Sequence, residues 1–209
     1  MPPEWAVHAR CWMAWPVREA SWGSGSEDAR LAYAEVAQAI ARFEPVTMIV
    51  QPEFVATASL YCGPGITVLP LAHDDSWTRD TGPTFVGSDD GEVAGVVWRF
   101  NGWGELHPDH SQDAQMARRI LDHVGLRQFE GGLVLEGGSV LVDGEGTCLA
   151  SLPLLLAKFR HIKNSKGVAS SHIRANINPE FAHKSIGARV DTGFVQTGYC
   201  CRKFKWCGT

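Results

Sequence analysis

Two segments of this chain, 56 residues apart, share one pattern that limits how the chain can fold. In the first, Asp80 and Gly82 precede an apolar strand and an Asp-Gly turn; in the second, Glu136 and Gly138 precede the same arrangement. Repeats at this period are typical of modules that cannot bury their apolar faces alone and that stack, often around an axis. Segments of this kind also arise by chance in mixed α/β chains, so the repeat alone does not exclude a fold that is not built from modules.

The residues around the repeat predict alternating helices and strands. Apolar positions, helix caps and Gly or Pro end signals divide the first 148 residues into short elements. We predict helices over residues 26–43, 52–63 and 111–123, the last closed by Gly125 as its C′ residue. We predict strands over residues 46–50, 66–71, 84–86, 93–100, 133–135 and 139–142, with residues 89–91 joining two of them as a hairpin. In the first helix we expect the larger apolar side chains to form the buried face, namely Leu31, Val36, Ile40 and Phe43. Alternation of this kind indicates the α/β class.

The acidic stretch over residues 74–83 is the candidate binding surface. It follows a strand that we expect to be buried, and it gathers three carboxylates, the Trp77 indole and the Arg79 guanidinium before Gly82 and Pro83. Loops at strand ends often carry the chemistry of a scaffold, and this set of side chains favours recognition of a cation. The alternative is an ordinary turn, in which the acids are solvated and Trp77 fills the core.

Charge divides the chain into two parts near residue 148. Residues 1–148 hold 9 Arg, no Lys and 21 acidic residues, a net charge of −12, whereas residues 149–209 hold 10 basic and 2 acidic residues, a net charge of +8. Such a change can mark a domain boundary, a basic tail that meets an acidic partner, or a segment that is not the native continuation of the gene. We expect residues 149–209 to form a separate, weakly ordered basic tail.

Composition indicates a globular protein of a reducing compartment. The chain is 44% hydrophobic and 20% charged, and no stretch reaches the roughly 18 apolar residues of a membrane span. The first residues lack the basic and apolar regions of a signal peptide. Six cysteines show neither paired metal-ligand spacing nor an even disulfide framework, and Cys11, Cys62 and Cys148 are expected to be small buried side chains. We therefore expect a cytoplasmic protein with no metal, no cofactor and no membrane partner.

Five motifs, two of which contain the repeat acids Asp80 and Glu136, occur in order within residues 1–148. They are PEW (3–5) with WMAWP (12–16), AIARFEPV (39–46), DDSWTRDTGPTF (74–85), WRFNGWG (98–104), and LEGGS (135–139) with VDGEGT (142–147). In sequence and order these motifs resemble the agmatine deiminase family, the bacterial and plant branch of the peptidyl-arginine deiminase and guanidino-group-modifying superfamily. The resemblance ends near Cys148, and the tail beyond it is unrelated.

The resemblance implies a fold and a reaction. The fold is a pentein-type α/β propeller, a ring of five ββαβ modules around a central site, of which residues 1–148 would supply about two to two and a half modules. The reaction converts agmatine to N-carbamoylputrescine and ammonia, a step toward putrescine. A guanidinium is planar and presents its N–H donors in a fork, so carboxylates that take two donors at once fix its plane.

The resemblance also assigns roles to individual residues. Asp80 corresponds to the carboxylate that grips the guanidinium, and Glu136 to a neighbouring acid that orients the substrate or a catalytic partner. Trp77 and Trp103 could flank the alkylamine through cation–π contacts. Without the resemblance, Glu136 is better explained as a turn acid bonded to the Gly137 and Gly138 amides.

The reaction also requires a nucleophile, which the sequence does not supply in a recognisable form. In this superfamily a Cys thiolate attacks the guanidinium carbon, ammonia leaves, and a His activates the water that hydrolyses the covalent intermediate. The Gly-His-Val-Asp-like and Gly-Asn-x-His-Cys-like motifs that carry these residues do not occur here. Cys200, Cys201 and Cys207 lie among basic residues that would lower a thiol pKa, but no motif supports them as substitutes. We therefore expect a truncated or frame-disrupted, inactive copy.

Two other functions stay open from the sequence. One is a deiminase of the same superfamily that acts on peptidyl or free arginine, and the other is a non-catalytic protein that binds a guanidine or polyamine. The basic tail lacks aromatic interleaving, so we expect no nucleic-acid partner. A partial ring would expose sheet edges, which predicts pairing between copies of the chain and a homo-oligomer.

Overall fold

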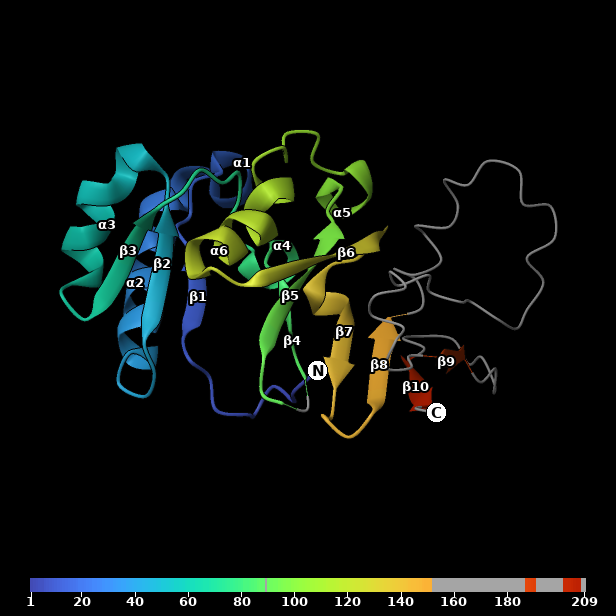
Figure 1. Cartoon of the computed structure of the whole chain (residues 1–209). Coiled ribbons are helices and arrows are strands. Elements are labelled where there is room, and N and C mark those ends of the chain that lie inside the picture. The colour runs from blue at the N-terminus through green and yellow to red at the C-terminus, as the bar shows by residue number, and fades with distance from the viewer. Residues whose placement is uncertain (89, 152–186, 191–200, 208–209) are drawn as a thin grey trace.

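The computed structural model describes residues 1–88, 90–151, 187–190 and 201–207. Their strands form three sheets (Figure 1). Mixed sheets and helices confirm the α/β class. Among the described residues, no helix has the length and apolarity that a membrane span requires.

The first sheet is parallel, with the strand order β1-β2-β3. Its strands are β1 (Cys11–Ala14), β2 (Val46–Val50) and β3 (Ile66–Pro70), connected mainly by α2 (Ser26–Ile40) and α3 (Val55–Cys62). Short helical turns precede these helices: α1 (Glu19–Trp22), η1 (Gly23–Gly25) and η2 (Pro52–Phe54). All five residues of β2 are buried, because helices cover both faces of this central strand.

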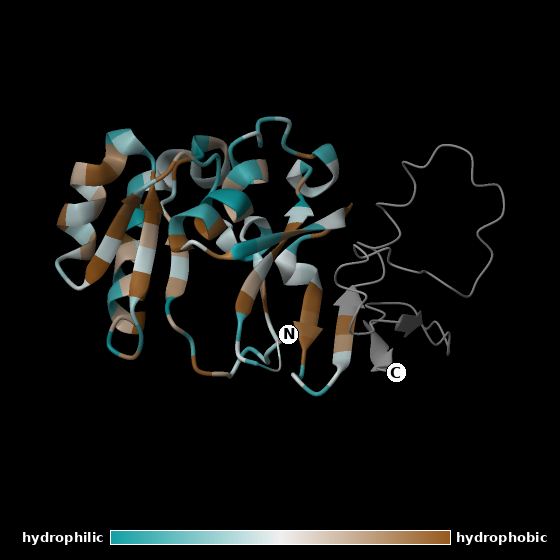
Figure 2. Ribbon diagram, viewed as in Figure 1, coloured by the Kyte–Doolittle hydropathy of each residue, from teal (hydrophilic) through white to brown (hydrophobic). Residues whose placement is uncertain are grey.

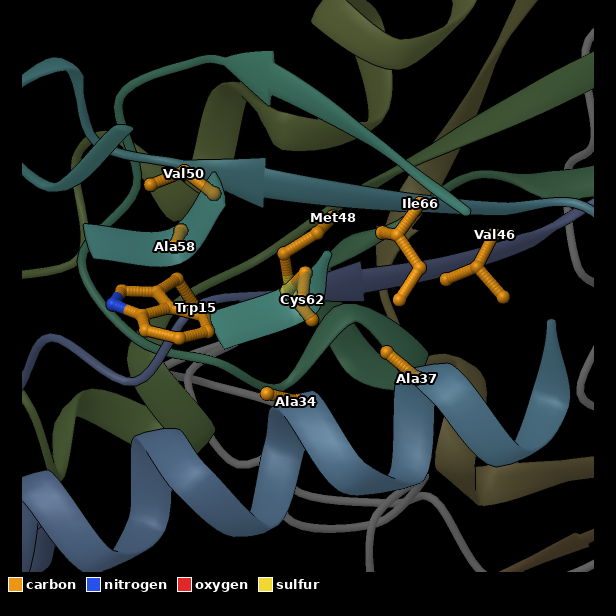
Figure 3. Close-up of a cluster of buried hydrophobic side chains, with 9 residues drawn as sticks. All are labelled: Trp15, Ala34, Ala37, Val46, Met48, Val50, Ala58, Cys62 and Ile66. Carbon is orange, nitrogen blue, oxygen red and sulfur yellow. The ribbon is translucent and has the colours of Figure 1, made fainter. Parts of the chain in front are cut away.

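The buried face of α2 differs from the prediction. Ala34 and Ala37 are buried, whereas Leu31 and Val36 are 44% and 50% exposed. Figure 3 shows the two alanines pointing from α2 toward the strands and α3. Small side chains let α2 approach the sheet closely, so Leu31 and Val36 lie outside the contact, whereas Ile40 packs against this core as predicted. The helix also ends at Ile40, which leaves Phe43 beyond it and exposed.

The second sheet belongs to one complete ββαβ unit. β4 (Thr84–Gly87) and β5 (Val93–Arg99) form the predicted antiparallel hairpin, and α6 (Met116–Val124) leads into β6 (Arg127–Val134), which runs parallel to β5. Gly125 ends α6 in the left-handed conformation, as predicted for its C′ position. Three short helical turns accompany this unit: α4 (Thr78–Thr81), α5 (Gly102–Glu105) and η3 (Asp113–Gln115).

The third sheet is antiparallel, with the strand order β7-β8-β10-β9. After the turn η4 (Gly137–Ser139) come β7 (Val140–Val142) and β8 (Thr147–Ser151), and later β9 (Gly187–Val190) and β10 (Cys201–Cys207). The predicted boundary at residue 148 therefore falls within β8. Residues 152–186, 191–200 and 208–209 lie outside the described residues, and so does most of the tail that we expected to be weakly ordered.

Helix α6 packs between the first and second sheets. Met116 and Ile120 pack with Ala14 and Ile49 of the first sheet, whereas Leu121 packs with Val97 of the second. In Figure 2, β2, β3 and β7 are largely brown, and α6 shows teal on the face turned to the viewer. One amphipathic helix thus joins two sheets.

The sequence repeat corresponds to a repeated structure. Asp80 lies in α4 directly before the β4–β5 hairpin, and Glu136 lies at the start of η4 directly before the β7–β8 hairpin. In both places an acid in a short helical turn leads into an antiparallel pair of strands. The number of modules in a ring stays a prediction.

Candidate active site

Two of the three acids in the 74–83 stretch stabilise the fold. Asp74 Oδ2 accepts hydrogen bonds from the amides of Gln112 (2.7 Å) and Asp113 (3.2 Å), and Asp113 Oδ1 accepts from the amides of Asp74 (2.8 Å) and Asp75 (3.3 Å). This reciprocal pair, the Asp74–Asp113 clasp, joins the end of β3 to the start of α6. Each carboxylate satisfies backbone donors of the other's turn.

Asp75 is also used internally. Its side chain is 1% exposed and accepts from Ser21 Oγ (2.9 Å) and from the Ser76 amide (2.8 Å), and it forms an ion pair with Arg18 at 3.1 Å. The prediction that all three carboxylates of this stretch form a cation-binding surface is therefore wrong, because Asp74 and Asp75 are bonded within the fold. Asp80 is the acid that faces the candidate site.

Burial perturbs the titration of Asp113. Removal from water raises the pKa of its carboxyl to about 6, against the lowering effect of the two amides that it accepts from. Its Oδ2 is buried without a hydrogen-bond partner. Ionised Asp113 is therefore an unfavourable component of the clasp.

The Asp80 carboxylate receives one donor on each oxygen, from two different parts of the chain. Trp103 Nε1 donates to Oδ2 (3.0 Å) from the loop after β5, and the Gly138 amide donates to Oδ1 (3.0 Å) from η4. Its side chain is half-buried. The structure thus brings Asp80, Trp103 and the Glu136 turn together, although they lie far apart in the sequence.

Two glycines allow this approach of η4 to α4. A Cβ on Gly137 would lie 2.2 Å from the Arg79 carbonyl oxygen, and a Cβ on Gly138 would lie 2.5 Å from Asp80 Oδ1. A side chain at Gly137 would displace α4 or η4, whereas a side chain at Gly138 would displace the Asp80 carboxylate. The Gly-Gly pair therefore fixes the position of Asp80 relative to Glu136.

Trp103 lies in a left-handed backbone turn. The φ angles are +63° at Gly102, +58° at Trp103, +81° at Gly104 and +67° at Glu105. This conformation costs roughly 1–2 kcal/mol for each residue other than glycine. Such strain persists where neighbouring contacts determine the conformation, and it often occurs at functional sites.

Glu136 is buried next to this arrangement. Its side chain is 2% exposed, and its carbonyl oxygen accepts from the Ser139 amide (3.0 Å) and Ser139 Oγ (2.6 Å). The Gly138 amide, which could have bonded the Glu136 carboxylate, donates to Asp80 instead. The simple turn explanation for Glu136 therefore does not hold at Gly138.

Trp77 is exposed and has a different aromatic partner. Its ring is 44% exposed and stacks on Trp22, with ring centres 6.1 Å apart and planes inclined by 18°. It lines a shallow hollow of about 280 Å³ with Met13, Tyr33 and Val36. The side-chain contacts of Trp77 and Trp103 are thus distinct, and of the two indoles only that of Trp103 donates to the Asp80 carboxylate.

Cys11, Cys62 and Cys148 are unpaired thiols. Cys62 and Cys148 are buried as expected, whereas Cys11 is half-buried. Burial raises the pKa of Cys148 to about 11, which keeps this thiol protonated and unreactive at neutral pH. In the described ranges no cluster of three His, Cys, Asp or Glu side chains could hold a metal ion.

The comparisons with known proteins identify the family. The family model of the Porphyromonas-type peptidyl-arginine deiminases matches residues 1–183. The chain belongs to this family. The match extends past residue 148, where the sequence motifs end, so the position of a domain boundary stays a prediction.

Relatives and solved structures of this deiminase family support the assignment. The agmatine deiminase of Stutzerimonas stutzeri is 42% identical over 183 residues, covering 85% of this chain and 50% of the relative. That of Medicago truncatula is 40% identical over 187 residues, covering 84% and 50%. The agmatine deiminase structure from Enterococcus faecalis is 36% identical with a TM-score of 0.74, covering 79% of this chain and 47% of that chain. The present chain thus spans about half the length of the curated relatives that it matches.

The sequence did not reveal two donors to Asp80 in the candidate site, the Gly138 amide and the Trp103 N–H. The Gly-Gly pair at 137–138 was a usable signal, because adjacent glycines allow close backbone contact. The Trp103 contact had no comparable signal, since it depends on a left-handed tryptophan that local sequence rules disfavour.

Proposed function

We propose that this chain carries the guanidinium-binding part of an agmatine deiminase-type site. In the complete reaction agmatine and water give N-carbamoylputrescine and ammonia. Asp80 would take the guanidinium N–H groups, and Glu136 would orient the substrate or a catalytic partner. Of the two tryptophans expected to flank the alkylamine, Trp77 would do so with its exposed ring, whereas the Trp103 N–H bonds Asp80. The names of relatives at 40–42% identity support agmatine as the substrate.

The observation that carries this proposal is the Asp80 carboxylate. Both of its oxygens already hold a donor, so its plane is fixed before a ligand arrives. A carboxylate offers about four lone-pair sites, so each oxygen keeps a site for a forked cation. A fixed acceptor of this kind suits a planar guanidinium better than a spherical ammonium.

The wider assembly belongs to the same proposal. The β4–β5–α6–β6 unit supports one module of a pentein-type ring, with the first and third sheets as parts of its neighbours. We also propose that uncovered sheet edges pair copies of the chain, and that the protein is cytoplasmic. Thiolate attack and hydrolysis would need a Cys and a His that the motifs recognised in this sequence do not include, so we propose that the chain alone is inactive.

Two measurements test the proposed function. Ammonia release from agmatine reports turnover, and calorimetric titration with agmatine, arginine and putrescine reports binding. We expect agmatine to bind without turnover, and Asp80→Asn to abolish that binding. Asp28→Asn, at an exposed position of α2, is the matched control and should bind as the wild type does.

The outcomes separate the alternatives. Binding of arginine in preference to agmatine would favour the peptidyl-arginine branch, which the family description also includes. Steady ammonia release would contradict the inactive-copy proposal. Absence of guanidine binding in the folded wild-type chain would contradict the proposed function itself.

A further inference from the structure

The indole of Trp103 is held so that its N–H has one direction. The ring of Phe100 meets it edge-to-face, with ring centres 4.9 Å apart and planes at 88°, and the ring of His107 meets it at 5.5 Å and 84°. Aromatic pairs favour this arrangement. The donor on this fixed ring lies 3.0 Å from Asp80 Oδ2.

The backbone turn that carries Trp103 also helps to hold its indole in place. Asn101 Oδ1 accepts from the Gly104 amide (2.9 Å) and closes the left-handed turn. A Cβ on Gly102 would lie 2.3 Å from the His107 carbonyl oxygen, so the loop folds tightly onto itself at this glycine. A strained tryptophan enclosed in this way holds its side chain in place at an energetic cost.

An aspartate carboxylate rotates readily about its last side-chain bond, because that rotation has broad, two-fold minima. The Gly138 amide alone would hold Oδ1 of Asp80, and the carboxylate could still rotate about this one hydrogen bond. The Trp103 N–H on the second oxygen removes this freedom. Both bonds together fix the plane in which the remaining lone pairs lie.

We propose that Trp103 is a positioning residue that fixes the carboxylate plane of Asp80 for a guanidinium, and that it acts through Asp80 instead of contacting the ligand chain. This inference rests on the proposed function. It gives Trp103 and Trp77 different roles: Trp103 orders the acid, and Trp77, which is 44% exposed although it stacks on Trp22, offers its exposed part to a ligand.

The test compares guanidine ligands of different length on Trp103→Phe. Phenylalanine keeps an aromatic ring against Phe100 and His107 but removes the N–H. We expect the affinity for methylguanidine and for agmatine to fall by the same factor, about five- to ten-fold, because the lost ordering concerns the shared guanidinium group. A loss for agmatine alone would overturn the proposal, since it would show contact with the alkylamine chain.

Trp98→Phe is the matched control. Trp98 Nε1 donates to Thr84 Oγ1 (2.9 Å) within the same hairpin, so this change removes an equivalent indole hydrogen bond that does not involve Asp80. We expect its guanidine affinities to equal those of the wild type. An equal loss in both variants would overturn the proposal, because it would indicate a general effect on the hairpin.

A second measurement does not depend on the folding of Trp103→Phe. The eight tryptophans give indole N–H signals in a ¹⁵N-labelled sample, and Asp80→Asn should shift the Trp103 signal while the others stay in place. An unmoved set of signals would overturn the proposal. If the wild-type chain binds no guanidine, the proposed function fails, and the indole signal still decides whether Trp103 orders Asp80.

Discussion

The Asp74–Asp113 clasp and the Asp80 site use the same residue type for opposite purposes. In the clasp and at Asp75, backbone amides, Ser21 and Arg18 bond carboxylates that are mostly buried. At Asp80, two donors orient a half-buried carboxylate and leave acceptor sites on it. The number and position of donors decide whether an acid supports the fold or presents itself to a ligand.

Loss of Asp75 should have the largest effect on stability. Asp75→Ala removes the buried ion-pair partner of Arg18 and the acceptor of the Ser21 hydroxyl, which should lower the free energy of unfolding by about 3–5 kcal/mol. Urea denaturation of wild type and variant measures the difference. A loss below about 1 kcal/mol would show that the acid is not needed by the fold.

Replacement of Asp113 should act in the opposite direction at neutral pH. The folded-state pKa of about 6 lies above the ordinary value of 3.8, so the folded protein holds this proton more tightly than the unfolded chain. This contribution is fully present below about pH 4 and is lost as the pH rises through 6. Asp113→Asn should therefore raise stability at pH 7 by about 2–3 kcal/mol.

The measurement for Asp113 is a pair of denaturation series between pH 4 and pH 8. The difference between wild type and variant should be small at pH 4 and should grow up to about pH 7. A difference that does not change with pH would show that Asp113 titrates normally in the fold.

Gly137→Ala tests the contact that joins η4 to α4 at the Asp80 site. The added Cβ would meet the Arg79 carbonyl oxygen, so we expect a loss of about 1–3 kcal/mol in stability together with weaker agmatine binding. Gly65→Ala is the control, because a Cβ there has open space and the backbone is not left-handed. Equal stability of the two variants in thermal unfolding would refute the close approach of η4 to α4.

The smallest effect on stability is expected at Asp80. Asp80→Asn should change the free energy of unfolding by less than about 1 kcal/mol, because the side chain is half-buried and its donors can reach solvent or the amide oxygen. Agmatine affinity should nevertheless fall by at least about 30-fold. Denaturation and calorimetry on one preparation separate the two quantities, and a large loss of stability would place Asp80 with the clasp.

The parts of the fold that the sequence predicted have local causes. The Gly125 end of α6 and the β4–β5 hairpin follow from residues that favour those conformations wherever they occur. Most of β6 was missed, because Gln128, Glu130 and its glycines do not form a strand pattern and only pairing with β5 makes them a strand. The predicted buried face of α2 was wrong at Leu31 and Val36 for a related reason, since close contact with the sheet selects small residues such as Ala34 and Ala37.

The candidate site shows the same division. Asp80 and Glu136 were found from motifs, and their proximity is consistent with the repeat. The role of Asp74 and Asp75 was missed because their partners are distant in the sequence: those of the Asp74 carboxylate lie 38 and 39 positions away, and Ser21, which bonds Asp75, lies 54 positions away. The position of Trp103 depends on four consecutive left-handed residues, a conformation that tertiary contacts impose.

The placement of α6 between two sheets has a consequence for how the chain folds. Met116 and Ile120 complete the apolar core on one face of the first sheet, and Leu121 completes the core of the second sheet, so neither of these two cores closes until this one helix is docked. The first sheet precedes α6 in the chain and β6 follows it, which makes both cores depend on contacts between distant segments. Amides of β2 and β5 should therefore exchange with solvent at similar rates, because the two sheets open in a single cooperative event.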